Sequence, residues 1–583
     1  MCPSDNISGP SEVQAIVLKL SESDPLYGKK KVRIKEIRRC YSASLLSYAE
    51  KILEGSSASV ELRVPLQSSP SSEWINTTVK AMLQISRIIH LDEADLYFFE
   101  DSTEGCYSPK NEMEALNSMI SLIDSSLTNS NCLHGHVLRG LRDAIVNLLS
   151  EFGYRNGMDD TTMKSHKCDE ESYLLQWGER IGVQSRLQIA HIEGFGRGAT
   201  AKEDLKVGDI ALEIPVHAII CEETMLESDW HPVLQKIDGI SVETMLLLWS
   251  MKERYNPSSK FKMYFETLPK EFNTGLSFGV NAIMALDGTP LFEELMQAKE
   301  HLRTQYEELF PALCNAHLDK FPPDLYTWDH YLWACELWYS NSMKVQFADG
   351  KLRTCLIPIA GFLNHSLYPH ITRYGKIDPV TNTLKFPMSR PCRAGEQCYL
   401  SYGNFSNSHL ITFYGFLPQG DNPYDVISLD IDCGSDGGDD GAECCNQTTH
   451  MVRGTWFSND HNVFHYGLPS PLLDYLRKAQ DSSSDINSPD KLKIEVQVLE
   501  DLYATFSGMM ENLGDSDSDA GDNVDWDVNL VLKYKDLQRR IISSILSSCS
   551  SGLKMLEDEL CRFASGDLTS KSETATSFLL ETV

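Results

Sequence analysis

The sequence alternates between strand-like and helix-like patterns in a way that limits the folds it can adopt. Short apolar runs separated by Gly-rich turns, such as Leu187–Ile192 and Asp209–Ile214, are typical of strands. Between residues 242 and 339 the apolar positions recur at helical spacing instead, and strand patterns resume around Leu356, Leu384 and Cys398. We therefore predict an α+β module over residues 171–420, with a helical insertion at about 242–339.

The segments on either side of this module have their own character. Residues 1–165 alternate helix-like stretches with Ser-rich breaks and form a mixed accessory region whose role the sequence does not reveal. Residues 425–583 are predicted to form a helical domain with acidic loops at Asp436–Glu443 and Asp515–Asp527, which are typical of solvated linkers. Its helix-like stretches are Pro471–Ala479, Leu492–Met510 and Leu530–Leu546.

Composition and charge exclude several classes of function. A chain of 583 residues is too long for one hydrophobic core, and 42% apolar with 23% charged residues is typical of folded protein. The chain has 52 Lys and Arg residues and 83 Asp and Glu residues. The resulting net charge of −31 repels polyphosphate. Nucleic acid is therefore not an expected partner.

The sequence carries no recognisable membrane or export signal. No segment approaches the roughly 18 apolar residues of a membrane-spanning helix, so no membrane association is expected. The first residues lack both the apolar run of a secretory signal and the Arg-rich character of a transit peptide. We expect a cytoplasmic or nuclear protein. The basic stretch Lys29–Arg39 fits the solvated side of a strand or helix better than a nuclear import signal.

The 16 cysteines are scattered mostly singly, which predicts buried thiols rather than a disulfide framework. The nearest approach to a metal-binding pattern is Cys433 with Cys444, Cys445 and His450. Its spacing is too loose and its intervening segment too loop-like for a zinc site, so no metal is expected.

Three short stretches carry most of the chemical information. Glu193–Gly198 superficially resembles a nucleotide-binding glycine loop, but no helix follows it, so the pattern predicts a strand–turn–strand hairpin. Gly361–Ser366 places an amide next to an imidazole, although a single such His is usually satisfied by the backbone. Leu400–Phe416 contains two Tyr-Gly pairs and by itself predicts a turn leading into a short helix.

In this order, and on both sides of a helical segment, the three stretches resemble the SET-domain methyltransferases. The class in question is typified by the Rubisco large-subunit lysine methyltransferase and the actin-histidine methyltransferase. The resemblance implies a knotted β-fold with a helical insertion over 171–420, followed by a helical substrate-binding domain over 425–583. It also implies S-adenosylmethionine as cofactor and a protein substrate, and it does not cover residues 1–165.

The resemblance assigns the cofactor contacts residue by residue. Glu193, Gly194 and Phe195 of the glycine hairpin would press their backbone against S-adenosylmethionine, which glycine permits. Asn364 and His365 match the family's Asn-His pair, whose amide and imidazole are suited to bonding the adenine and amino-acid ends of the cofactor.

The same resemblance places Tyr402 at the methyl-transfer centre, in contact with the cofactor, and Tyr414 and Phe416 along the acceptor channel. Methyl transfer from a sulfonium is an in-line displacement, so a neutral nitrogen has to be held on the axis opposite the breaking bond. A narrow aromatic channel favours a neutral lysine amine by desolvating the ammonium form. Tyr402 would orient the amine without acting as a formal base, and no metal is required.

Two departures from the family pattern keep alternatives open. Asn341 stands where the class usually has Arg, and Gly361 stands where it tends to have Asp. The leading prediction is a protein-lysine N-methyltransferase acting on a non-histone protein, since the cysteine clusters that flank many histone-directed SET modules are absent. Tyr414 favours lysine over the alternative acceptor, histidine. A third interpretation, based on Asn341 and Gly361, is a non-catalytic SET-like scaffold that binds a protein partner.

Overall fold

The computed structural model describes the chain at residues 15–51, 59–67, 69–98, 107–129, 134–156, 169–192, 194, 196–228, 230–236, 240–431, 448–480, 488–514 and 524–565. The chain divides into two compact units, which are described separately. The first takes the described residues within 1–96, 103–278 and 295–422, and the second takes those within 97–102, 279–294 and 423–583. The domain boundaries expected near residues 165 and 425 stay predictions.

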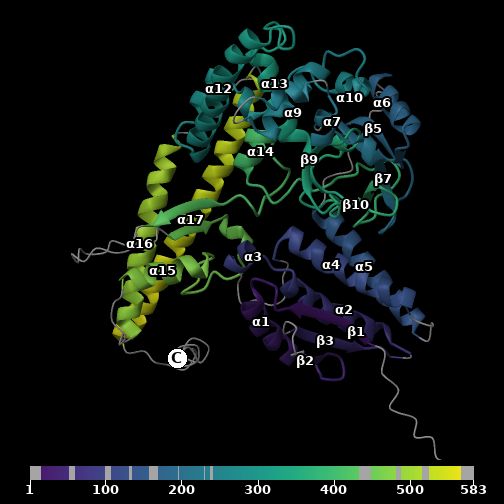
Figure 1. Ribbon diagram of the computed structural model, residues 1–583. Coiled ribbons are helices and arrows are strands. Elements are labelled where there is room, and N and C mark those ends of the chain that lie inside the picture. Colours follow the sequence, from purple (N-terminus) through teal and green to yellow (C-terminus); the bar gives the residue numbers. More distant parts are fainter. Residues whose placement is uncertain are drawn as a thin grey trace, which may run out of the picture. The chain divides into compact units, whose positions relative to one another are not determined.

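The N-terminal part of the first unit contains a three-stranded antiparallel sheet with helices packed on it. The central strand, β3 (Ser59–Pro65), pairs with β1 (Ala15–Ser21) and β2 (Ser47–Lys51). Alternate residues of β1 are buried, as expected for a strand with one face on the core. Helix α2 (Ser72–Ile89) packs against β1 and against α4 (Pro109–Asn129), and Figure 1 shows α4 beside α5. The other helices up to residue 156 are α1 (Tyr27–Arg39), α3 (Glu93–Tyr97) and α5 (Gly135–Asn156).

Helix α1 contains the basic stretch Lys29–Arg39. One of its lysines, Lys30, is buried, with its Nζ 2.7 Å from Oδ2 of Asp24 and 2.9 Å from the carbonyl oxygen of Ile89. The basic stretch is therefore part of a folded helix, which agrees with its interpretation as one side of an ordinary helix or strand.

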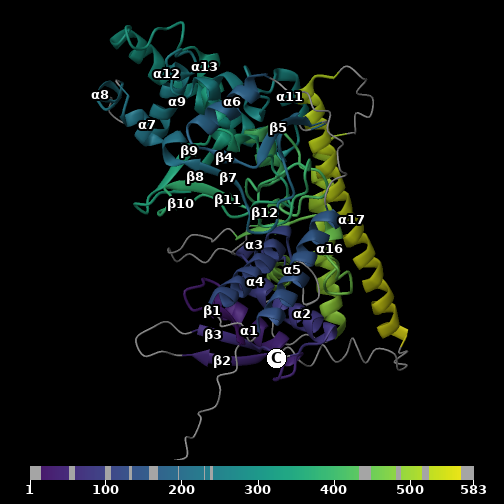
Figure 2. The same ribbon diagram turned by 90° about the vertical axis from the view of Figure 1, so that its right-hand side faces the viewer.

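The strands of the β module form one four-stranded sheet and two hairpins. The sheet has the order β10-β11-β7-β4, and its pairs are all antiparallel. The hairpin of β5 (Leu187–Ile192) and β6 (Gly196–Ala201) encloses the glycine motif, as the pattern predicts. Figure 2 shows the sheet strands in the same region as the hairpin of β8 (Ser342–Gln346) and β9 (Leu352–Leu356). The sheet strands are β4 (Gln184–Ser185), β7 (Ile210–Pro215), β10 (Ile377–Asp378) and β11 (Thr383–Pro387).

Helices precede, interrupt and follow these strands, so the expected α+β class is confirmed. Helix α6 (Asp169–Arg180) packs against β4 and β5, and α9 (Val242–Glu253) packs against α13 (Trp328–Asn341) inside the helical segment. Helix α13 begins at an N-cap, Thr327, whose hydroxyl accepts from the backbone N–H of His330. The remaining helices are η1 (Val216–Ala218), α7 (Glu222–Leu226), α8 (His231–Leu234), α10 (Lys262–Thr267), η2 (Gly275–Ser277), α12 (Pro290–Ala316), η3 (Ala360–Phe362) and α14 (Asn407–Tyr414).

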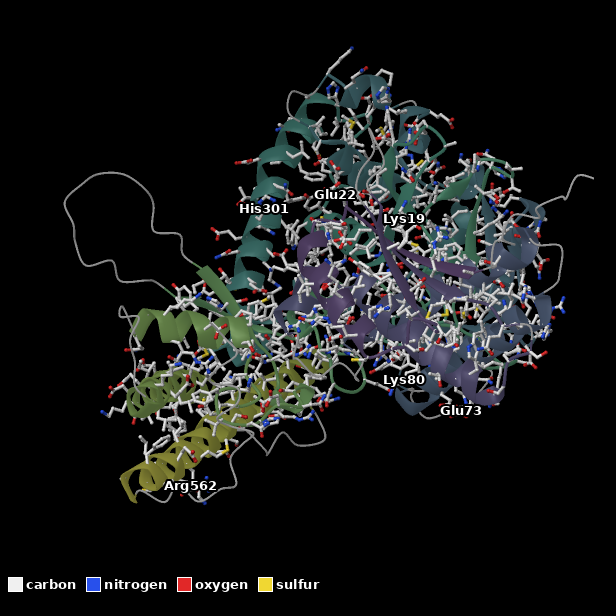
Figure 3. All side chains as sticks on the ribbon, turned by 90° about the horizontal axis from the view of Figure 1, so that it is seen from below. Lys19, Glu22, Glu73, Lys80, His301 and Arg562 are labelled. Atoms are coloured by element: carbon white, nitrogen blue, oxygen red, sulfur yellow. The ribbon has the colours of Figure 1, made fainter. Side chains whose placement is uncertain are left out.

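The second unit is mainly helical. Its two longest helices, α16 (Ser488–Asn512) and α17 (Trp526–Ser565), pack along each other, and Figure 3 labels Arg562 near the end of α17. Their facing apolar residues, including Phe506 and Ile545, form the buried core of this unit. The other elements are α11 (Val280–Ala285), β12 (Ile427–Ile431), β13 (Thr448–Val452), η4 (Thr455–Phe457) and α15 (Ser470–Gln480). Within the described ranges, no helix combines the length and the apolar character needed to span a bilayer.

Candidate active site

Residues 364–371 and residues 399–400 of the β module are interlaced at the site. The backbone N–H of Leu400 donates to the carbonyl of Asn364 at 2.9 Å, and the N–H of Ser366 donates to the carbonyl of Leu400 at 3.1 Å. The N–H of Ile371 donates to the carbonyl of Tyr399 at 3.1 Å. Residues 399–400 therefore lie between two passes of the loop that carries the Asn-His pair, with Leu400 bridged to both His365 and Ile371.

The first pass of this loop begins with a strained residue. Ile359 has a φ of +73°, a left-handed conformation that a β-branched side chain rarely adopts. Its side chain is buried, and η3 follows it directly. Such conformations persist where the surrounding packing enforces them, often at functional sites.

Tyr402 and His365 are held by hydrogen bonds to each other and to the loop. The backbone N–H of Tyr402 donates to Nδ1 of His365 at 3.0 Å, and the phenol hydroxyl donates to the carbonyl oxygen of Leu363 at 3.1 Å. Because Nδ1 accepts, the proton of the neutral imidazole lies on Nε2. Burial lowers the pKa of His365 to about 4, and burial raises the pKa of Tyr402 above its ordinary value. Both side chains are therefore neutral near pH 7.

Aromatic rings surround Tyr402. Its ring stacks on that of Tyr414 with centroids 4.9 Å apart and planes at 24°, while Phe416 meets both rings edge-on at 6.5 Å and 6.4 Å. The ring of His365 lies 6.2 Å from that of Phe416. The structure thus brings together the predicted Tyr402, Tyr414, Phe416 and His365.

The local sequence of α14 explains how Tyr414 and Phe416 reach this place. Ser406 caps the helix by accepting from the backbone N–H of His409, which fixes where the helix begins. Gly415 ends it with a φ of +73°, the left-handed conformation that glycine adopts without penalty. This turn at Gly415 lets the rings on either side of it both face Tyr402.

One aromatic residue of the site was not singled out from the sequence. The hydroxyl of Tyr374 donates to the carbonyl of Ser401, next to Tyr402, and its ring stacks on Phe386 at 5.8 Å. Burial, with a smaller contribution from Tyr414, raises the pKa of Tyr374 to about 12. A Tyr between Arg and Gly in an irregular loop has no pattern that marks it, so only the fold reveals this contact.

The glycine hairpin approaches the Asn-His pair closely. Gly194 and Gly196 have φ values of +79° and +70°, which favour glycine, and a Cβ at either position would meet no atom within 4 Å. A Cβ at Gly198 would lie only 3.0 Å from Nδ2 of Asn364, and this amide donates to the carbonyl of Arg197 at 3.1 Å. The first two sequence motifs therefore meet at Asn364, whereas Glu193 and Phe195 lie outside the described residues.

Arg197 ties the hairpin to its surroundings. Its Nη1 donates to the carbonyl oxygen of Thr267 at 2.5 Å and lies 3.6 Å from Oε1 of Glu171. The guanidinium also lies over the ring of Phe362, 5.3 Å from its centroid. These contacts fix the strand that follows Gly194 and Gly196.

The two departures from the family pattern face each other. A Cβ at Gly361 would lie 3.2 Å from Oδ1 of Asn341, a tight contact that the amide could relieve only by a small shift. Nδ2 of Asn341 donates to the hydroxyl of Ser340 at 2.7 Å. An amide at 341 and the absence of a side chain at 361 are therefore matched to each other.

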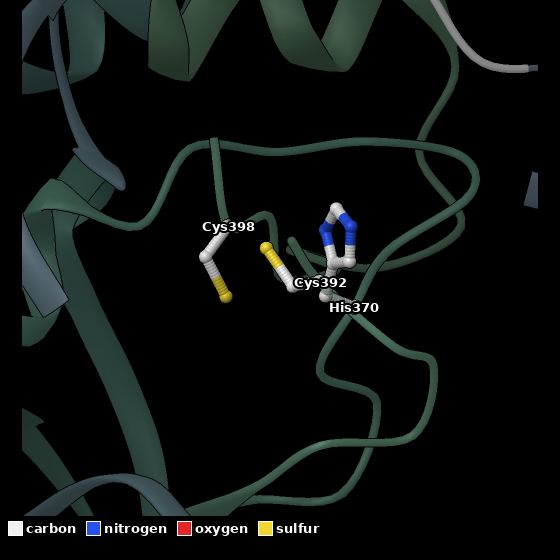
Figure 4. Close-up of side chains that lie close together, drawn as sticks. All are labelled: His370, Cys392 and Cys398. Carbon is white, nitrogen blue, oxygen red and sulfur yellow. The ribbon is translucent and has the colours of Figure 1, made fainter. Parts of the chain in front are cut away.

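A separate buried cluster contains His370, Cys392 and Cys398, shown in Figure 4. Their possible ligand atoms lie within 4.8 Å of one another. However, Nδ1 of His370 accepts from the backbone N–H of Tyr399 at 3.1 Å, so its proton lies on Nε2, the atom that a metal would need. Nε2 also lies 3.4 Å from Oε1 of Glu396. We therefore assign no metal here.

The loose cysteine pattern considered in the sequence is mostly undescribed, because Cys433, Cys444 and Cys445 lie outside the described residues. The fourth member, His450, lies on β13, with Nδ1 3.0 Å from the hydroxyl oxygen of Tyr97.

Comparisons with known proteins agree with this arrangement. No family model matches the chain. The actin-histidine N-methyltransferases of Canis lupus familiaris and Homo sapiens are both 26% identical to it over 268 residues, a match that covers 44% of this chain and 44% of each relative. The match thus spans less than half the length of these curated relatives.

Two solved structures resemble the chain more extensively. The SET domain of LSMT bound to lysine and AdoHcy superposes with a TM-score of 0.51 at 17% identity, covering 70% of this chain and 98% of that one. Rubisco LSMT bound to AdoMet superposes with a TM-score of 0.50 at 17% identity, covering 71% and 100%. These superpositions show that the chain has the SET-domain fold. In sequence the chain is similar to the actin-histidine N-methyltransferases, and in fold it is similar to Rubisco LSMT. Both likenesses confirm the resemblance seen in the sequence motifs.

Proposed function

We propose that this chain is an S-adenosylmethionine-dependent protein methyltransferase that modifies a side-chain nitrogen. The observation that carries the proposal is the neutral phenol of Tyr402, fixed between His365 and Leu363 and enclosed by Tyr414 and Phe416. The names of the relatives and of the LSMT complexes support both the cofactor and the type of reaction.

The residues of the site would act by holding the cofactor and the acceptor nitrogen in the right relative positions. The hairpin around Gly194, with Asn364 and His365, would hold S-adenosylmethionine, which supplies an activated methyl group when bound. The remaining proton of the neutral His365 imidazole, on Nε2, would serve as a hydrogen-bond donor to the cofactor. Tyr402 would orient the acceptor nitrogen, since its raised pKa keeps the phenol protonated and makes it a poor base.

We further propose lysine as the acceptor. The stacked Tyr402 and Tyr414 rings and the edge of Phe416 offer a narrow aromatic surface that suits an aliphatic chain and tolerates a methylammonium product. Burial among these rings would also favour the neutral amine. Histidine is the second candidate, because the actin-histidine N-methyltransferases match this chain at 26% identity.

The substrate is proposed to be a non-histone protein of the cytoplasm or nucleus. The helical second unit, with its core between α16 and α17, is the proposed substrate-binding part, as in the class the chain resembles. The net charge of −31 makes a basic substrate segment electrostatically favourable.

The test is incubation of the full chain with labelled S-adenosylmethionine and cell extract, followed by mass spectrometry of each labelled band. We expect a labelled protein whose modified residue is lysine. If the modified residue is histidine, the proposed methyltransferase activity stands, but the assignment of lysine as the acceptor is wrong. Calorimetric titration with S-adenosylmethionine separates the remaining alternative, because a non-catalytic scaffold would show neither binding nor labelling.

A further inference from the structure

A buried carboxylate on α13 holds a turn that lies against the site. Glu336 is only 3% exposed, and its Oε1 accepts hydrogen bonds from the hydroxyls of Thr274 at 2.6 Å and Ser277 at 2.5 Å. Burial raises the pKa of Glu336 to about 6, against the lowering effect of these two hydroxyls. Two charge-assisted hydrogen bonds to one oxygen make this a strong attachment, because bonds to ionised acceptors exceed neutral ones.

The same turn is held from a second side. Nζ of Lys299, on α12, donates to the carbonyls of Leu276 and Phe278 at 2.9 Å each. The hydroxyl of Thr274 also accepts from the backbone N–H of Leu276 at 3.2 Å, which closes η2. A buried carboxylate and an ammonium therefore fix the turn formed by residues 273–278.

This turn packs against the C-terminal end of α14 with no space to spare. A Cβ at Gly275 would lie 2.9 Å from Cα of Thr412 and 3.1 Å from the carbonyl oxygen of Ile411. A Cβ at Gly415 would lie 1.6 Å from the carbonyl oxygen of Asn273. The backbone of the turn is thus in direct contact with the helix end that carries Tyr414 and Phe416.

We propose that Glu336 is a positioning residue for the acceptor channel: through the turn 273–278 it fixes the end of α14, and thereby the placement of Tyr414 and Phe416 against Tyr402. This inference rests on the proposed function for its catalytic consequence. Its structural part, the restraint of α14 by a carboxylate two contacts away, stands independently of any activity.

The role differs from that of an ordinary core residue. The bonds of Glu336 go to a turn and not to the glycine hairpin or the Asn-His loop. Loss of Glu336 should therefore weaken binding of the acceptor and lower turnover while leaving cofactor affinity intact. A general structural role would reduce thermal stability and cofactor affinity together.

Three variants of the full chain separate these outcomes. Glu336→Gln keeps an acceptor oxygen for both hydroxyls, whereas Glu336→Leu has similar bulk and leaves the hydroxyls without their acceptor. Glu253→Gln is the matched control, since Glu253 is also buried and accepts from the side-chain amide of Asn256 at 3.0 Å, but on α9. Methyl transfer, cofactor affinity, melting temperature and hydrogen exchange along the whole chain, including residues 273–278 and 407–416, are measured for each.

For Glu336→Leu we expect kcat/KM to fall about tenfold or more, with the cofactor Kd changed less than about twofold and faster exchange confined to the turn 273–278 and residues 407–416. Glu336→Gln and Glu253→Gln should stay within about threefold of the wild type. Normal exchange and turnover in Glu336→Leu would overturn the proposal, and so would an equal loss of cofactor affinity. If the wild-type chain shows no methyl transfer, the proposed function fails, and hydrogen exchange alone decides whether Glu336 restrains α14.

Discussion

Tyr402 and His365 are fixed to one another by the backbone N–H of Tyr402, which donates to Nδ1 of the imidazole at 3.0 Å, with the two ring centroids 5.3 Å apart. This bond joins the Asn-His motif to the Tyr-Gly motif. A substitution of either residue should therefore alter the position of the other.

Tyr402→Phe tests the role of the phenol. Removing the hydroxyl eliminates a polar group at the proposed transfer centre, and we expect methyl transfer to fall by about a hundredfold or more. The fold should survive, because only the hydrogen bond to Leu363 is lost, which costs about 1 kcal/mol. Initial rates and thermal unfolding are the measurements.

The matched control is Tyr306→Phe, since the hydroxyl of Tyr306 also donates to a backbone carbonyl, that of Tyr326, at 3.1 Å. This variant should lose similar stability and keep its activity. An unchanged rate in Tyr402→Phe would contradict the proposed function.

His365 predicts a pH dependence of stability. Its pKa of about 4 in the folded chain lies below the ordinary value of 6.5, so between these values the unfolded chain binds a proton that the folded chain does not. The free energy of unfolding should thus fall as the pH is lowered from 6.5 to 4, by a total of about 3 kcal/mol from this group. Above pH 6.5 the imidazole is neutral in both states, so this group no longer changes the free energy of unfolding with pH.

The measurement is denaturant unfolding across that pH range for the wild type and for His365→Asn, whose carbonyl oxygen can replace Nδ1 as acceptor from Tyr402. The variant should lose less stability on acidification than the wild type. Parallel pH profiles would show that the imidazole is not held in its neutral form.

Gly198→Ala tests the contact between the hairpin and the Asn-His loop. The added methyl would lie 2.6 Å from Cδ1 of Ile192, 2.7 Å from Nε2 of Gln397 and 3.0 Å from Nδ2 of Asn364, so the neighbours have to move. We expect destabilisation of about 2 kcal/mol and weaker cofactor binding. Gly28→Ala is the control, because nothing lies within 4 Å of its Cβ position, and it should leave both quantities nearly unchanged.

The cluster of His370, Cys392 and Cys398 gives a prediction about metals. Because Nδ1 of His370 accepts from the N–H of Tyr399, the proton lies on Nε2, and a metal bound there would have to displace it. We expect the purified chain to hold less than about 0.1 equivalent of zinc by mass spectrometry and to keep its melting temperature in chelator. One equivalent of zinc, lost in Cys392→Ser, would reverse this assignment.

Much of the fold could be predicted because its signals are local. Strand β5 coincides with the predicted run Leu187–Ile192, and the glycine hairpin follows it. Helix α15 (Ser470–Gln480) lies within one residue of the predicted stretch Pro471–Ala479 at each end. Helix α17 runs from Trp526 to Ser565, far beyond the predicted Leu530–Leu546, because serines in its later turns obscure an apolar face that packing on α16 maintains.

The contacts that shape the site were less accessible, because they join residues far apart in sequence. Thr274 and Glu336 are 62 positions apart, and nothing in either local pattern predicts that they meet. The contact between Asn341 and Gly361 likewise becomes apparent only in the three-dimensional structure. The two departures from the family pattern, at 341 and 361, are sterically related to each other. Tyr374 reaches Ser401 from an irregular loop that has no periodicity to interpret.

The interlacing of residues 399–400 with the loop 364–371 sets an order of events during synthesis. A ribosome that has released the chain only as far as Ile371 has made the loop but not the strand that it encloses, so the loop lacks its hydrogen-bond partners. A nascent or truncated product ending before Tyr399 would therefore present an unfilled loop to chaperones and proteases, and assembly of the site has to wait until Tyr402 has been made.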